Sequence, residues 1–240
     1  MSNKSELVGN YFGTIYLTVM SLLQGIVLAQ LVPSIIRYTE LATDPWRDVH
    51  LLPLVLMLLI IFNIWHHYAI GIFFLRWFPN IIDTIIPFMI SLAQFFLLSY
   101  LDVNDSVNDI DVTAWMKGFA VILLLGCFAY FGAVWRLDAD LFTNIMSKEN
   151  AVIHVIISRK FYKLAGFAVL FQGLFALLIV FLQKETWLLF SLIFLVIHLI
   201  LSEYWLLRSV KPHFIKAMDE LELEKQSRIN VTDSLGHPEN

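Results

Sequence analysis

Six side chains that can carry charge or form strong hydrogen bonds lie within, or at the edge of, long apolar stretches of this sequence. Burying such groups unpaired inside a bilayer costs free energy, so their positions are informative. They comprise one amide, three histidines and two carboxylates. The set, termed here the polar cluster, is Asn63, His66, His67, Asp83, His198 and Glu203.

Three chemistries are open to such a cluster. An imidazole, whose unperturbed pKa is about 6.5, can relay protons or sense pH beside a carboxylate. Neutral histidines can ligate a divalent cation with Glu203 and Asp83 as the oxygen donors. Two histidines on facing helices can hold a haem iron, which makes His198 with His66 or His67 the pair to check. None of these is required by the sequence, and we expect no cofactor.

Each residue of the cluster also has a purely structural interpretation. A polar side chain in a span commonly hydrogen-bonds a neighbouring helix. Adjacent residues face about 100° apart on a helix, so one of His66 and His67 at most can point squarely into a given site. Asp83 follows Pro79 and Asn80 and suits a helix cap.

The elements that must position these residues are apolar stretches, each holding at least the roughly 20 residues that span a hydrocarbon core. With no water to pair the backbone there, helices are the expected form. Composition agrees, since 15% of residues are charged and 59% are hydrophobic, whereas soluble proteins average about 25% charged. The sequence predicts an all-α polytopic membrane protein with spans at residues 11–36, 51–75, 81–101, 114–135, 161–183 and 186–207.

Lysine and arginine are distributed unevenly between the two sides that six spans would create. Twelve lie on the side of the two termini and four on the other, and basic loops stay on the cytoplasmic side. We therefore expect both termini in the cytoplasm and the protein in a plasma or inner membrane. Tryptophans near span ends, such as Trp115 and Trp135, are typical of interfacial anchors.

The remaining cytoplasmic segments are candidates for docking a protein partner. Residues 1–212 are expected to form the six-span domain, and 213–240 a short helix to about Lys225 followed by a disordered tail. In the loop 137–160, the fourth and fifth helices are expected to project and turn near residues 148–150, with an apolar stripe that includes Val152 and Ile156. A partner would bind 137–160 and 213–225; alternatively these segments pack on their own protein.

One face of the first span is lined by small and hydroxyl-bearing residues. Residues three or four apart share a helix face. Such a face is what the wall of a narrow water-filled path requires, and it also suits close contact with another helix. The pathway candidates are Thr14, Thr18, Ser21, Gln24 and Gly25.

Several function classes find no support in the sequence. The basic residues form no patch with interleaved aromatics, which argues against nucleic-acid binding. The single cysteine excludes an intrachain disulfide. No catalytic motif is present, and we do not expect an enzyme. The leading hypothesis is an oligomeric channel or small-ion transport protein. The alternatives are a non-conducting membrane subunit or sensor with a protein partner, and a bis-histidine haem electron-transfer protein.

Overall fold

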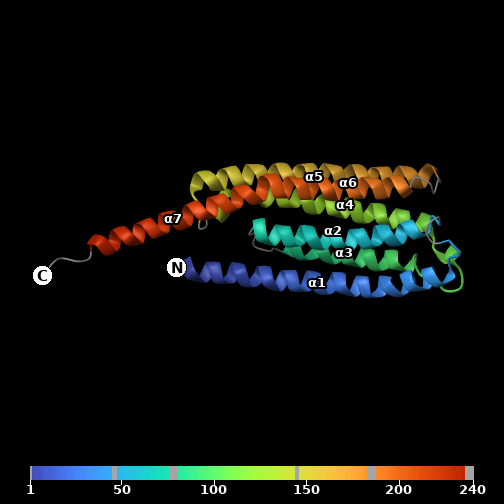
Figure 1. Ribbon diagram of the computed structural model, residues 1–240. Helices are drawn as coiled ribbons and strands as arrows, with labels where there is room; N and C mark the ends of the chain where they lie inside the picture. The colour runs from blue at the N-terminus through green and yellow to red at the C-terminus, as the bar shows by residue number, and fades with distance from the viewer. Residues whose placement is uncertain (1, 45–47, 76–80, 144–145, 183–187, 236–240) are drawn as a thin grey trace.

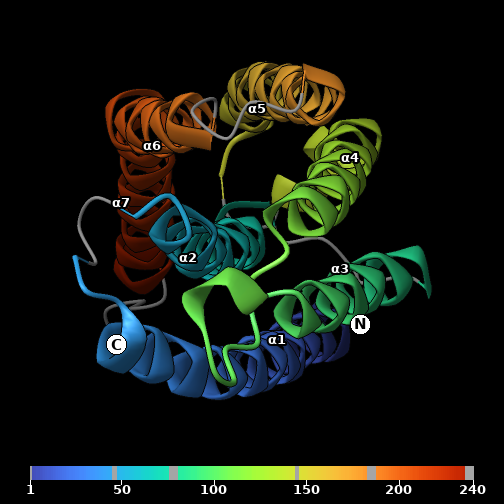
Figure 2. The same ribbon diagram turned by 90° about the vertical axis from the view of Figure 1, so that its right-hand side faces the viewer.

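The computed structural model describes residues 2–44, 48–75, 81–143, 146–182 and 188–235, and these ranges are helical with short connections. The two views of the ribbon show one elongated bundle (Figures 1 and 2). Three one-turn elements, η1, η2 and η4, lie between the longer helices at Val107–Asp109, Ala139–Phe142 and Leu206–Val210. The α-helices are α1 (Ser2–Leu41), α2 (Leu51–Leu75), α3 (Ile81–Ser99), α4 (Val112–Arg136), α5 (Lys148–Leu182), α6 (Leu188–Trp205) and α7 (Lys211–Leu235).

Five helical stretches in the described ranges are long and apolar enough to cross a membrane. They are Ile15–Leu41, Leu51–Ala69, Val112–Arg136, Lys148–Leu182 and Ile193–Leu223. The predicted third span corresponds to α3, whose described apolar part, Ile85–Ser99, is shorter. The prediction of an all-helical fold is therefore confirmed, and five of the predicted spans are helices of sufficient length and apolar character.

The first six helices form a closed ring rather than a sequence of hairpins. Neighbours in space follow the order α1, α3, α4, α5, α6, α2 and back to α1, as the view along the bundle axis shows (Figure 2). Each helix turns part of its surface inward to the buried apolar core and part outward. Side chains from helices far apart in sequence, such as α2 and α5, therefore meet near the middle of the ring.

Glycines allow α4 and α5 to pack closely. A Cβ atom added to Gly166 would lie 3.3 Å from ring atoms of Phe131, and one at Gly173 would lie 3.4 Å from the side chains of Leu123 and Leu124. A larger residue at either position would have to displace these neighbours. Small residues thus set the close contact of α5 with α4, on which the geometry of the site depends.

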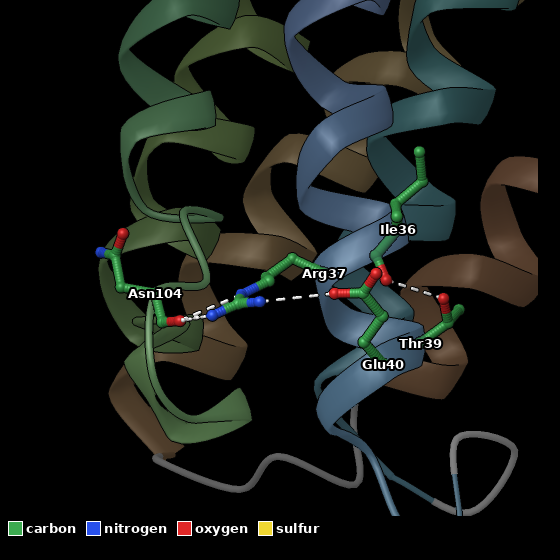
Figure 3. Close-up of polar contacts among 5 residues, drawn as sticks. All are labelled: Ile36, Arg37, Thr39, Glu40 and Asn104. Atoms are coloured by element: carbon green, nitrogen blue, oxygen red, sulfur yellow. Dashed lines mark hydrogen bonds and ion pairs between the residues drawn. The ribbon is translucent and has the colours of Figure 1, made fainter.

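One end of the bundle, termed the Arg37 end, is tied together by polar contacts (Figure 3). The Arg37 guanidinium donates two hydrogen bonds, of 3.1 and 3.0 Å, to the carbonyl of Asn104 and lies 3.4 Å from Glu40. In the same loop, Asp109 accepts hydrogen bonds from the backbone amides of Asp105, Ser106 and Asn104, which hold the pKa of its carboxyl below the usual value. This acidic loop is therefore an ordered connection between α3 and α4.

The opposite end corrects part of the prediction for residues 137–160: α5 begins at Lys148, near the predicted turn, but α4 does not project. Helix α4 ends at Arg136 instead of projecting, because the Asp138 carboxylate accepts a hydrogen bond from the amide of Asp140 and starts a 3₁₀ turn. Arg159 on α5 donates a 2.6 Å hydrogen bond to the carbonyl of Leu137, which follows the last turn of α4. Ser147 then accepts from the amide of Asn150 at the start of α5.

Two residues of the predicted apolar stripe, Val152 and Ile156, lie on one face of α5. Val152 and Ile156 are 43% and 61% exposed, whereas Ala151, His154 and Val155 are buried. Helix α5 is thus rotated so that a histidine faces inward and the aliphatic pair faces outward.

Helix α7 continues from α6 through a single π-helical turn, η4. It extends to Leu235, beyond the predicted end near Lys225, and projects from the bundle past the start of α5 (Figure 1). The N-terminus lies at this same end of the bundle.

Candidate functional site

Two histidines of the polar cluster meet inside the ring. His67 comes from α2 and His198 from α6, which are neighbours in the ring, and their ring centroids are 6.0 Å apart. The two side chains are 9% and 5% exposed. Among the described residues, neither ring nitrogen of His67 has a hydrogen-bond partner. The Nε2 of His198 has none there either. Buried polar atoms are normally paired, so this site calls for an explanation.

Aromatic rings from two further helices surround the pair. Tyr130 on α4 lies 5.2 Å from His67 and 6.4 Å from His198, measured between ring centroids. On α5, Phe161 stacks on His67 at 6.2 Å, and Tyr162 lies 6.0 Å from Tyr130. We refer to His67, His198, Tyr130 and Tyr162 as the histidine centre. Four helices of the ring contribute to it.

A cavity of about 80 Å³ adjoins the histidine centre. Its wall includes the polar side chains of Asn63, His67, Tyr130 and Tyr162. The space exists because α4 presents small residues there: Gly126, Ala129 and Ala133. A cavity needs about 10–15 Å³ to hold one water molecule, so this one has room for several. The Tyr162 hydroxyl and Asn63 Oδ1 also lack a hydrogen-bond partner within the described part of the chain, and both atoms are buried.

Of the other members of the predicted cluster, His66 is the one whose side chain the structure describes. The ring of His66 lies 5.8 Å from His67 and is half-buried on a different side of α2, as expected for adjacent helical residues. The side chains of Asp83, in the first turn of α3, and of Glu203, on α6, lie outside the described residues. The structure therefore brings together Asn63, His67 and His198.

The imidazoles of His67 and His198 are the cofactor ligands that the described part of the site brings together. No group of three histidine, cysteine, aspartate or glutamate side chains able to hold a metal ion is found among the described residues. A haem held by His67 and His198 would lie beside Tyr130, whose ring centroid is 5.2 and 6.4 Å from those of the two histidines. Proton exchange between imidazole, phenol and water can use the same groups.

The pathway candidates of α1 divide between two faces. Thr18, Ser21 and Gly25 are exposed, whereas Gln24 is buried and pairs with Gln94 of α3 through amide hydrogen bonds of 2.9 and 3.1 Å. Ser21 accepts a 3.0 Å hydrogen bond from the Trp65 indole. The side chain of Thr14 lies outside the described residues. The outward face of α1, defined here by Thr18, Ser21 and Gly25, is thus separate from the histidine centre.

Sequence reasoning missed the tyrosines of the site. Tyr130 and Tyr162 each carry a hydroxyl in a predicted span, which is the signal that would have added them to the polar cluster. Gln94, the partner of Gln24, was missed for a similar reason, since an amide in the third span is also costly to bury unpaired.

No protein-family model, curated protein or solved structure matches this chain.

Proposed function

We propose that this chain is an integral protein of a plasma or inner membrane that crosses it six times, with both termini in the cytoplasm. Helix α3 supplies the sixth crossing. Its described part is short, but it lies within the ring between α1 and α4. Support for the orientation comes from the basic residues, and from the position of the N-terminus at the same end of the bundle as α7 (Figure 1).

The orientation predicts where reporters become accessible. A reporter inserted at Asp105 should be external, and reporters placed at Asp140 or after Asn240 should be cytoplasmic. Alkaline phosphatase, which folds outside the cytoplasm, and a fluorescent protein that folds inside it give opposite readouts at each position. A cytoplasmic reporter at Asp105 would contradict the six-span model.

Within this topology, the function that the geometry supports best is transport of a small ion, with a proton as the ion. The observation that carries the proposal is the pair of buried histidines, 6.0 Å apart, beside a cavity lined by three tyrosines and an asparagine. Imidazole both accepts and donates protons near neutral pH, and phenol hydroxyls and water can continue a hydrogen-bonded chain. A purely structural histidine pair would be expected to use its ring nitrogens in hydrogen bonds.

The experiment is proton flux in liposomes. Purified protein is reconstituted at a low protein-to-lipid ratio with a pH-sensitive dye inside, and a pH step is applied with valinomycin and potassium to prevent a membrane potential from building up. We expect the internal pH to relax faster than in protein-free liposomes. If the internal pH relaxes equally fast with and without the protein, and the protein carries no potassium or sodium flux either, the proposal of ion transport is wrong.

We further propose that several copies associate through the outward face of α1. Replacing Gly25 with Leu tests this, because a Cβ at Gly25 meets no atom of its own subunit within 4 Å and so points into open space. Gly25→Leu should therefore disrupt assembly without destabilising the subunit. The measurement is mass by light scattering in detergent, together with thermal stability.

Val19→Leu is the control, because it adds one methylene at another exposed position of α1. It should leave assembly intact. A wild-type protein that is monomeric in both detergent and nanodiscs would overturn the proposal of self-association.

The alternative function, a non-conducting subunit or sensor with a cytoplasmic partner, is favoured by one observation on α7. The base of this helix is held to α5 by a 2.7 Å hydrogen bond from Asn150 to Glu220, and the His213 imidazole lies 3.3 Å from the Asn150 carbonyl. Beyond this contact α7 extends away from the bundle (Figure 1). The liposome experiment separates the two functions, because a non-conducting subunit leaves the pH gradient intact.

A further inference from the structure

A further histidine is buried where the base of α7 meets the start of α5, at the end of the bundle opposite Arg37. His154 of α5 is 0% exposed. Its ring lies 6.2 Å from that of His213 on α7, with an angle of 14° between the two planes, and 5.3 Å from that of Phe214. The ring of Phe142 in η2 lies 4.7 Å away. We refer to Phe142, His154, His213 and Phe214 as the α5–α7 junction.

The junction is the place where α7 is attached to the bundle. The imidazole Nε2 of His213 lies 3.3 Å from the carbonyl oxygen of Asn150, and the Asn150 side chain donates a 2.7 Å hydrogen bond to Glu220. Beyond these contacts α7 projects from the bundle (Figure 1). Because two rings of α7 stand against His154, removal of α7 from this position would expose the His154 imidazole to water.

This burial makes the attachment of α7 sensitive to protons. An imidazole in water takes up a proton with a pKa of about 6.5. Burial among apolar rings disfavours the charged form, because the cation loses its hydration. A proton on His154 is therefore accommodated better when α7 has left the junction. Since the released state binds the extra proton, attachment is favoured at high pH and weakens as the pH falls below about 6.5.

The neighbouring elements bring one titratable ring against His154 and several exposed charges around it. His213 faces it from α7, and a proton on both rings would add repulsion between like charges. The exposed charged groups are screened by water and salt. They are Asp140 in η2, Arg208 in η4, and Lys211, Lys216 and Glu220 on α7.

We propose that the α5–α7 junction is a pH-sensitive attachment that holds α7 on the bundle at neutral pH and releases it in acid. In the proposed topology the pH that controls it is that of the cytoplasm. Release exposes Phe214 and Ala217, which is 1% exposed when α7 is attached. Cytoplasmic pH would thus control an apolar surface on the segment that we expect to bind a partner. The inference stands whether or not the protein conducts ions.

The experiment measures the distance between α5 and α7 at two pH values by electron-electron spin resonance. Nitroxide labels are attached to Ile156→Cys on α5 and Leu223→Cys on α7, both exposed positions, in a Cys127→Ala background. The full-length protein is placed in nanodiscs, where both of its faces meet the same buffer. The ratio of attached to released α7 should fall about tenfold from pH 7.5 to pH 5.5, as expected for one histidine that is protonated only after release.

Two variants assign the response to the buried histidine. His154→Phe keeps an aromatic ring in the junction but cannot take up a proton, so α7 should stay attached at both pH values. Glu220→Gln removes a titratable carboxylate and keeps an oxygen that can accept from Asn150, so the tenfold change should remain. His50→Phe, at the Arg37 end, is the matched control for replacing a histidine and should also respond normally.

The inference is wrong if the wild-type ratio is the same at pH 7.5 and 5.5, or if folded His154→Phe responds as the wild type does. Loss of the response in Glu220→Gln would also overturn it, because the carboxylate would then be the titrating group. Should His154→Phe not fold, the wild-type protein still tests the inference: below pH 6.5 the ratio must approach a tenfold fall for each pH unit, and a flat dependence contradicts it.

Discussion

Proton flux should fall about tenfold or more when His67 is replaced by Phe, which corresponds to a barrier higher by about 1.4 kcal/mol. Phenylalanine preserves the aromatic packing against Tyr130 and Phe161 but can neither accept nor donate a proton. His198→Phe should have a similar effect. Because the two rings adjoin, we expect the double variant to conduct no less than either single variant, which is the non-additivity of residues that act as a unit.

The control is His213→Phe, since His213 lies on α7 and is separate from the histidine centre. It should conduct normally. Circular dichroism and gel filtration establish that each variant is folded before its flux is measured. Normal flux through folded His67→Phe would assign this histidine to packing, and ion transport would have to follow another route.

The largest loss of stability is expected from Trp115→Ala. Trp115 is fully buried, and its ring stacks at 4.9 Å on that of Phe119, one turn later on α4. Removing a buried tryptophan in this way costs about 3–5 kcal/mol, because the cavity left behind collapses only in part. The measurement is the loss of helicity during titration with sodium dodecyl sulfate in mixed micelles.

Trp135→Ala on the same helix is the matched control. Trp135 is 85% exposed, so its replacement should change the free energy of unfolding by about 0.5 kcal/mol or less. Equal losses for the two variants would show that Trp115 stabilises the protein as an anchor rather than through packing. The sequence suggested the same anchoring role for both residues, and exposure distinguishes them.

Much of the fold could be predicted because long apolar stretches in a membrane have few alternatives to helices. The predicted boundaries of the second span coincide with α2, and the start of the third with that of α3. Prediction failed where local hydrogen bonds compete with the helix. After Arg136, the carboxylate of Asp138 accepts a hydrogen bond from the nearby amide of Asp140, and α4 ends. The periodicity of apolar residues does not reveal whether the chain forms this local hydrogen bond or continues the helix.

The site was predictable in part for a related reason. The cost of burying a polar group identified His67 and His198, but their proximity depends on α2 and α6 being neighbours in the ring, which spacing along one helix does not reveal. Gln24 is a case in which the position along one helix gave the wrong expectation. It was a pathway candidate as an amide near the small residues of α1, yet its side chain turns inward to Gln94, a partner 70 residues away in sequence.

The π-helical turn between α6 and α7 has a mechanical consequence. There the Lys211 amide donates to the carbonyl of Leu206, five residues back rather than four. Each residue of an α-helix advances the chain by about 100°, so rewinding this turn as α-helix would rotate α7 about its own axis by roughly that angle relative to α6. The π-helical turn thus sets the rotation of α7 relative to α6, the helix that carries His198 about two turns before it.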